Sequence, residues 1–333
     1  MAAVAVFITA AALILCVGTG SVRILPGEIL AVIKNKLFDA ELPEQITQSM
    51  AAIIWEIRMP RVFTAFAVGA MLSVSGAVMQ AILQNPLASS YTMGVSSGAS
   101  LGAAVIIILE ISIPLLLPGA AFACGLSTVF LVLAAASSLD GTLRNSTVIL
   151  FGMILSLFVS AIVTMLSAAF SQHMQRMVLW QMGTFAGRRW THAVGLLAAA
   201  AVGTLAVSLK HRELDVMSFG DEGAAAVGVE SGREKKKLLV IASLLTALSV
   251  CFTGVIGFID LAAPHAVRRI FGASHKYVIP MSGVIGGGFM ALADMLSRTV
   301  LSPQEIPVGA VTALLGAPFF LWVYFGTRRR ERE

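Results

Sequence analysis

The sequence predicts an all-α membrane protein of about ten transmembrane helices. Of its residues, 57% are hydrophobic and 12% are charged, with a mean hydropathy of +0.88, whereas soluble domains carry about a quarter charged residues. The apolar runs are long and continuous, unlike the roughly ten-residue alternating segments of a membrane β-barrel. With about 20 apolar residues needed for each helical span, the candidate spans are residues 3–22, 62–83, 93–109, 113–138, 147–169, 191–209, 238–253, 254–267, 278–297 and 306–325.

The first apolar run, residues 2–22, is expected to be the first span of one transmembrane domain over residues 1–333. A secretory signal would carry a basic stretch before the run and a small-residue cleavage site after it, and the run has neither. Cys16, Cys124 and Cys251 are isolated within apolar runs and lack metal-ligand spacing. The sequence therefore indicates no metal site and no evident disulfide.

The charges of the loops orient the chain. With a cytoplasmic N-terminus, 14 of the 23 lysines and arginines fall on the cytoplasmic side and 9 on the outer side. The positive-inside rule favours this orientation. Basic loops that anchor helices against anionic lipid also account for the net charge of +5. Nucleic-acid binding is not indicated.

Two features of the apolar runs predict how the helices pack and where they break. Glycines recur at every fourth position of residues 94–102, which predicts a face for close helix packing. An Asn-Pro pair at 85–86 interrupts an uncharged stretch, and residues 254–269 hold a second broken run with a proline and a histidine. Interrupted segments in both halves of a chain are typical of transporters built from repeats.

Two acidic residues, Asp260 and Asp294, lie at or near membrane depth, where a carboxylate is costly and suggests a function by default. Asp294 precedes Arg298 by four residues, so a mutual pair near the outer end explains it. Asp260 has a partner only if Arg268 or Arg269 lies along the same short helix, and its role stays open. An ion-coupled transporter energised through Asp260 or Asp294 is one alternative function.

The charged loop at residues 210–237 argues against that alternative, because an ion-coupled carrier needs no docking element. An acidic start with an alanine-rich continuation follows Gly220, so two short helices joined at this glycine are expected. The loop is either an ordinary interfacial segment or an element that docks into another protein. Its apolar face is expected to consist of Leu214, Val216, Met217 and Phe219.

An enzymatic alternative depends on the G-x-S-x-G pattern of residues 94–98, which would make Ser96 a nucleophile served by His265. That pattern requires a strand-to-helix turn, and here it opens a membrane helix, so small-residue packing explains it better. The chain contains no G-x-x-x-x-G-K-[ST] pattern, and ATP hydrolysis must be supplied by another subunit. We therefore expect a transporter subunit that is not itself an enzyme.

Several segments together resemble the permeases of vitamin B12, haem and iron-siderophore ABC importers, the FecCD family. They follow the family's order over most of the chain: "RMPR" at 58–61, "GAMLSVSGAVMQAILQNPLASSYTMGVSSGASLGA" at 69–103, "WQMGTFAGRRW" at 180–190, "ELDVMSFGDEGAAAVGV" at 213–229, "GVIGFIDLAAPHAVRRIFGASHKYVIP" at 254–280 and "ADMLSRTVLSPQEIPVGAVTALLGAPFF" at 293–320.

The resemblance implies a fold like that of the vitamin B12 importer permease, with ten helices in each of two permease subunits around a central pathway. Two cytoplasmic ATPase subunits would hold ATP and magnesium, so that this chain binds no cofactor itself. An extracytoplasmic binding protein would deliver the ligand to the outer face of the bacterial cytoplasmic membrane. An iron-siderophore is the expected cargo, moved by ATP-driven alternating access, with haem and cobalamin as alternatives.

The family's functional residues carry over by motif match. Pro60 sets a first helical turn, and Arg58 and Arg61 are expected to turn one cationic face to water, where it meets acidic residues of the binding protein together with Arg298. Snorkelling to lipid phosphates is the alternative for these arginines. The coupling-helix loop to the ATPase contains Leu214, Asp215, Val216, Met217, Phe219, Gly220, Asp221, Glu222 and Gly228. The expected pathway and gate residues are Met93, Gly94, Ser97, Asn145 and Ser146.

Three positions depart from the family's pattern. Asp260 replaces a small residue, the "SSY" that begins at Ser89 replaces a proline-containing form, and Ser274 replaces an aspartate before His275. These departures leave the family resemblance intact and the role of Asp260 open.

Overall fold

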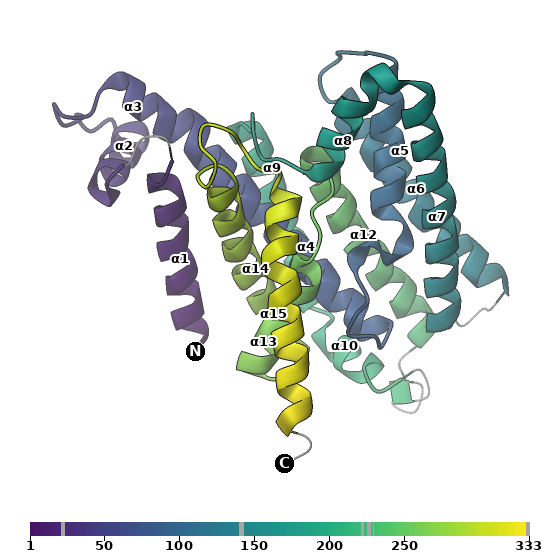
Figure 1. The fold of residues 1–333 in the computed structure, drawn as a ribbon. Helices are drawn as coiled ribbons and strands as arrows, with labels where there is room; N and C mark the ends of the chain where they lie inside the picture. Colours follow the sequence, from purple (N-terminus) through teal and green to yellow (C-terminus); the bar gives the residue numbers. More distant parts are fainter. Residues whose placement is uncertain (21–23, 140–142, 221–222, 225–227, 229, 331–333) are drawn as a thin grey trace.

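The computed structural model describes residues 1–20, 24–139, 143–220, 223, 224, 228 and 230–330, with the backbone alone for residues 322–330. The described part of the chain contains helices and connecting turns and no β-strand, as the sequence predicts. Both ends of the chain lie at the same end of the molecule (Figure 1). This placement agrees with an even number of membrane crossings.

Each predicted span overlaps a helix, although the one predicted at 254–267 becomes a helix only from residue 259. Within the described residues, six helices are long and apolar enough to cross a membrane: α4 with the turns before it, α6, α7, α9, α12 and α14, while α1, α5 and α15 are shorter apolar helices. The ten helices are α1 (Ala2–Gly18), α4 (Met59–Ile82), α5 (Val95–Ile108), α6 (Leu116–Leu139), α7 (Asn145–Ala169), α9 (Trp190–Ser208), α12 (Ser231–Thr253), α13 (Ile259–Phe271), α14 (His275–Ser297) and α15 (Val308–Arg330).

Apart from α10, the short helices between the spans were not apparent in the sequence. Their composition is mixed, because they lie at the membrane faces and need neither a continuous apolar run nor a charged one. Helices α2 and α3 lie at the end of the molecule opposite both termini (Figure 1). These elements are α2 (Pro26–Phe38), α3 (Gln48–Ala52), η1 (Ile53–Arg58), η2 (Ser90–Met93), η3 (Ser171–His173), α8 (Met174–Met182) and α10 (His211–Met217).

Helix α4 forms the centre of the fold, and nearly all of its residues are buried among α9, α12, α13 and α14. Small residues permit this packing. A methyl group at Gly69 would lie 2.4 Å from the carbonyl oxygen of Gly286 in α14, and one at Gly76 would lie 1.9 Å from the carbonyl oxygen of Asp260 in α13. Helix backbones that approach this closely leave no room for a side chain.

The predicted glycine stripe of α5 is confirmed as a packing face. A methyl group at Gly98 would meet the backbone of Cys124 at 2.6 Å, and one at Gly102 would meet that of Ala120 at 2.4 Å, both in α6. Gly94 has a different role, because its φ of +81° forms the left-handed turn from which α5 begins. The stripe therefore joins α5 to α6 and opens the helix.

The predicted coupling loop is shorter than the sequence suggested. Helix α12 begins at Ser231, within the predicted loop, and Lys235 in its second turn is 1% exposed. Helix α10 is the first of the two expected short helices. Asp221 and Glu222, in the region expected to form the second, lie outside the described residues.

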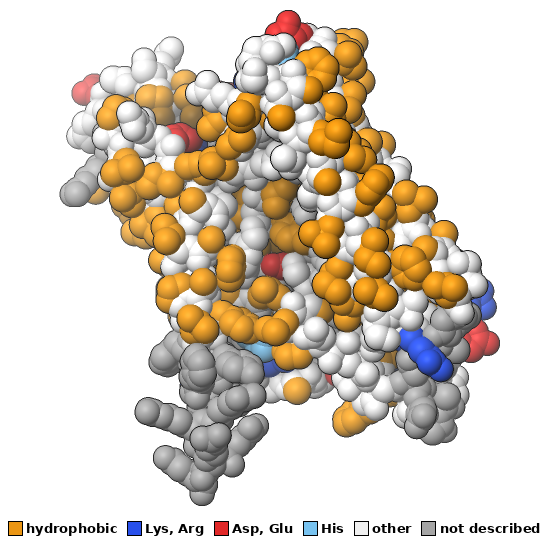
Figure 2. Space-filling model, turned by 45° about the vertical axis from the view of Figure 1, so that its right-hand side comes forward, with side chains coloured by type: hydrophobic (Ala, Val, Ile, Leu, Met, Phe, Trp, Pro, Cys, Tyr) orange, Lys and Arg blue, Asp and Glu red, His pale blue; other side chains and the backbone are white. Residues whose placement is uncertain are grey.

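The outer surface is largely apolar. Figure 2 shows apolar side chains over most of one face, with a hollow between two apolar halves. Such a surface is typical of contact with lipid or with another subunit.

Candidate functional site

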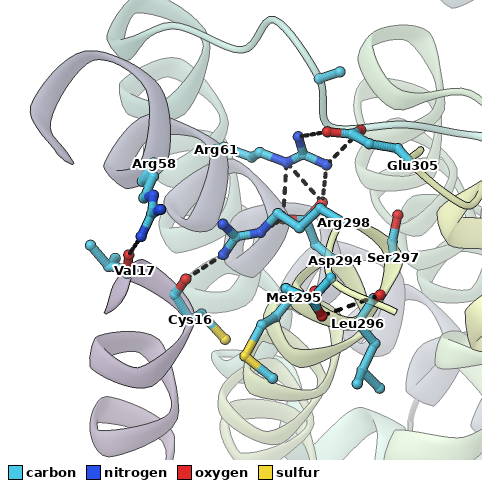
Figure 3. A network of polar contacts seen from close by, with 12 residues as sticks. Cys16, Val17, Arg58, Arg61, Asp294, Met295, Leu296, Ser297, Arg298 and Glu305 are labelled. Atoms are coloured by element: carbon cyan, nitrogen blue, oxygen red, sulfur yellow. Dashed lines mark hydrogen bonds and ion pairs between the residues drawn. The ribbon is translucent and has the colours of Figure 1, made fainter. Parts of the chain in front are cut away.

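Arg61, in the first turn of α4, lies at the centre of a buried charge cluster at the end of the molecule opposite both termini (Figure 3). Its Nε and Nη2 donate to the carboxylate of Asp294 at 2.9–3.1 Å. Its Nη1 and Nη2 donate to Glu305 at 2.7 and 3.0 Å. Planar bidentate pairs of this kind are the strongest arrangement that a guanidinium makes with carboxylates.

Arg58 and Arg298 complete the cluster by binding the C-terminal end of α1. Arg58 Nη1 donates to the carbonyl oxygens of Val17 and Gly18 at 3.0 and 3.1 Å, and Arg298 Nη2 donates to that of Cys16. These carbonyls end a helix and carry the negative pole of its dipole, which cations stabilise. The cluster thus attaches α1 to α4 and α14.

The structure brings the three sequence-predicted arginines together, but the expectation that Arg58 and Arg61 turn a cationic face to water is wrong. Arg58 is only 5% exposed, and Arg61 is only 8% exposed. The end of α1 covers Arg58, while Asp294 and Glu305 surround Arg61. The chain thereby supplies its own acidic partners, which lie more than 230 positions away along the sequence.

Asp294 pairs mainly with Arg61, which the sequence did not indicate. Its predicted partner Arg298 is a second contact, with Nε 3.6 Å from Asp294 Oδ2. Glu305 was missed entirely, because an acidic residue in a loop after a span usually faces water. The hydrogen bond from Arg61 holds the pKa of Glu305 below its usual range. Arg61 therefore lies between two carboxylates, and three guanidinium groups gather at this end of the molecule.

The two interrupted segments of the chain dock on each other. Asp260, in the first turn of α13, accepts hydrogen bonds from the Ser90 backbone N–H at 2.9 Å, from Ser90 Oγ at 3.0 Å and from Ser89 Oγ. Tyr91 donates its hydroxyl to the Ile256 carbonyl oxygen at 2.7 Å. Asp260 therefore binds Ser89 and Ser90. All three residues belong to the positions that depart from the pattern expected for the family.

These contacts answer the question that Asp260 raised. Arg268, one of two arginines that could have paired with it, instead donates to the side chain of Gln80 and lies over the end of α4. Asp260 is 1% exposed and uses one carboxylate oxygen for all three hydrogen bonds. Its role in this structure is to hold η2, and with it the start of α5, against α13.

The expected pathway residues Met93, Gly94 and Ser97 lie within helix packing. Met93 is fully buried and contacts Ser243 Oγ through its sulfur at 3.7 Å, and Ser97 Oγ donates to the Gly94 carbonyl oxygen at 3.0 Å. They are therefore enclosed within this chain, and the assignment of a pathway to them stays a prediction. The rival interpretation of Ser96 as a nucleophile lacks its required strand, because the 3₁₀ turn η2 precedes α5.

The expected gate residues begin α7 at the cytoplasmic end. Asn145 Oδ1 accepts a hydrogen bond from Lys235 Nζ at 2.9 Å, and Lys235 also donates to the Leu143 carbonyl oxygen at 3.2 Å. Ser146 lines a cavity of about 550 Å³ beside Arg144. The burial of Lys235 was not evident from the sequence, because nothing distinguishes a buried lysine from its exposed neighbours within a basic run.

Helix α10 does not present the single apolar face that the sequence suggested. Leu214 and Met217 are buried within this chain, whereas Phe219, just past the helix, is 86% exposed. Gly220 follows with a φ of +105°, a conformation that glycine adopts without steric cost. One large aromatic side chain therefore projects at the end of the molecule that carries both termini (Figure 1).

Comparison with known proteins identifies the chain. The model of the FecCD transport family matches residues 8–325. The chain belongs to this family. It is 36% identical to the cobalamin import system permease protein BtuC of Halobacterium salinarum, over 89% of this chain and 78% of that protein. It is 34% identical to the Fe(3+)-citrate import system permease protein YfmE of Bacillus subtilis, over 96% of this chain and 92% of that protein.

A solved structure, described as an inward-facing conformation of a metal-chelate type ABC transporter, matches with a TM-score of 0.83 and 29% identity, over 97% of both chains. The chain is therefore an ABC importer permease and a multi-pass protein of the cytoplasmic membrane, and a separate ATPase subunit hydrolyses ATP. Family membership also excludes the serine hydrolase and the ion-coupled carrier as its function.

Replacement of Asp260 tests its assignment as a structural tie. Asp260→Ala leaves the buried N–H of Ser90 without an acceptor, which costs on the order of 1–3 kcal/mol, so a lower melting temperature in detergent is expected. Asp260→Asn keeps an oxygen that accepts this bond and should cost less, with uptake by the assembled importer retained. Loss of uptake in Asp260→Asn at an unchanged melting temperature would contradict the structural role.

Proposed function

We propose that two permease chains of this kind form the membrane pathway of a binding-protein-dependent importer. It carries an iron-siderophore, or a related metal chelate, into the cytoplasm by ATP-driven alternating access. The observation that supports the proposal most directly is the placement of the arginine cluster and α10 at opposite ends of the same membrane helices (Figures 1 and 3). A substrate-binding protein would dock at the cluster, and an ATPase at α10.

The proposed cargo follows from the relatives. One is named for cobalamin and another for ferric citrate, and the similar structure is of the metal-chelate type. The shared chemical class is a bulky metal chelate. A second permease subunit would close the hollowed apolar face in Figure 2, and a pathway wide enough for such a cargo would run between the two subunits.

Docking at the cluster would proceed by exchange of acidic groups. Asp294 is fully buried, whereas the side chain of Glu305 is 41% exposed. We propose that an acidic side chain of the binding protein replaces Glu305 on Arg61. The three guanidinium groups gathered at this end of the molecule favour approach of an acidic surface. Arg61 then keeps its buried bond to Asp294 throughout docking.

Contact with the ATPase would use Phe219. An exposed aromatic side chain at the end of a short helix is the kind of anchor that fills a pocket on a partner. Phe219 is 86% exposed in this chain, so its ring is available for such a contact.

Reconstitution tests the function itself. The chain is co-expressed with candidate ATPase and binding-protein subunits, placed in liposomes and assayed for uptake of ferric siderophore, haem and cobalamin. Uptake of the ferric siderophore that requires ATP, the ATPase and the binding protein is the expected result. Uptake of cobalamin or haem alone would overturn the proposed cargo, and uptake without the ATPase would overturn the importer mechanism.

Glu305→Gln tests docking by exchange. The variant removes the acid that competes with the binding protein for Arg61. A charge reversal at Arg61 itself is unsuitable, because it would bring three carboxylates together and disrupt folding. A partly exposed ion pair is worth about 0.2–1 kcal/mol, so the binding protein should bind the assembled complex up to about fivefold more tightly.

Glu44→Gln is the matched control, since it removes the same charge from an exposed acid between α2 and α3, which lie at the end of the molecule opposite both termini (Figure 1). Equal affinities of wild type, Glu305→Gln and Glu44→Gln in a titration with the binding protein would contradict the exchange.

A further inference from the structure

Asp215 attaches α10 to the beginning of α14. Its Oδ1 accepts from the backbone N–H of His275 at 2.7 Å and lies 2.7 Å from His275 Nδ1, and Ser274 Oγ donates to its Oδ2 at 3.3 Å. The first N–H groups of a helix have no partner within the helix, and a carboxylate there also meets the positive pole of the helix dipole. Asp215 therefore acts as an N-terminal cap for a helix other than its own.

The histidine adds a second bond whose direction is determined by chemistry. A carboxylate only accepts hydrogen bonds, so His275 Nδ1 carries the proton and donates it. His275 is buried, and its Nε2 has no partner among the described residues. The imidazole is thus held in place by Asp215.

A separate bond attaches the C-terminal end of α10 to α4. Gln84, two residues beyond the end of α4, donates from Nε2 to the carbonyl oxygen of Met217 at 3.2 Å. Leu214, which precedes Asp215, is fully buried. The C-terminal half of α10 is therefore bound twice, to α14 through Asp215 and to the end of α4 through Met217.

Helices α4 and α14 behave as one body. A methyl group at Gly286 would lie 1.8 Å from Ser73 Oγ, and one at Gly287 would lie 2.8 Å from the carbonyl oxygen of Phe66. At the far end of the pair, Arg61 of α4 and Asp294 of α14 form a buried ion pair of 2.9 Å. Sliding of one helix along the other would break both sets of contacts.

We infer that Asp215 is a positioning residue that makes α10, the α4–α14 pair and the arginine cluster move together. The inference rests on the proposed function, in which α10 receives the ATPase and the cluster receives the binding protein. A movement of α10 then displaces α4 and α14 together, and Arg61 moves with them. The predicted pathway residues take no part in transmitting this movement. Because coupling of binding free energies is reciprocal, occupancy of either face changes the affinity of the other.

Asp215→Ala in the complete reconstituted complex tests the inference. Two quantities are measured: the ratio of ATPase rates with and without loaded binding protein, and the change in binding-protein affinity when a non-hydrolysable ATP analogue is added. Couplings of this kind amount to about 5–150-fold, and Asp215→Ala should reduce both ratios at least about fivefold. His275→Ala keeps the backbone N–H that donates to Asp215, so it should reduce both ratios by a smaller factor.

Glu213→Ala is the matched control. Glu213 is an acid of the same helix, but it pairs with Lys210 rather than with α4 or α14. Both ratios should equal those of wild type. If Asp215→Ala does not assemble, Asp215→Asn replaces it, since it keeps an oxygen for the His275 N–H and loses the charge.

Wild-type ratios in Asp215→Ala, or in Asp215→Asn where the alanine variant fails, would overturn the inference. A wild-type complex that shows no stimulation by any binding protein would instead overturn the proposed function. A merely structural role of Asp215 would lower the melting temperature and leave both ratios unchanged.

Discussion

The close approach of α4 and α14 is the contact on which the rest of the structure depends. Gly69 in α4 faces the backbone of Gly286 in α14 at a distance that excludes a methyl group. Lipid offers little gain for burying one apolar helix against another, so such packing must come from close contact and interhelical polar bonds. Here both are present, because the Arg61–Asp294 ion pair joins the same two helices at one end.

The polar groups buried around this pair serve to connect segments. The arginine cluster attaches the end of α1, Asp260 holds the two interrupted segments together, and Asp215 attaches α10. An unpaired charge or backbone group at these depths would cost several kcal/mol. These polar residues therefore take hydrogen-bond partners from distant parts of the chain.

The sequence was sufficient for the fold class, the ten helices and the family, because long apolar runs and motif order are local signals. It was insufficient for the partners of polar residues. Arg61 meets Glu305 only after α14 and the following loop return beside α4, and Lys235 becomes buried against the start of α7. The structure brings the three predicted arginines together, yet their burial depends on acids whose position no spacing rule indicates.

The most direct test of the central role of the α4–α14 contact compares Gly286→Ala with Gly283→Ala. Alanine gains about 1 kcal/mol over glycine within a helix, and a methyl group at Gly283 meets Val74 only at an ordinary 3.5 Å. The account predicts that Gly283→Ala melts at or above the wild-type temperature with full uptake. Gly286→Ala should melt lower and lose uptake, and wild-type melting and uptake in Gly286→Ala would contradict the account.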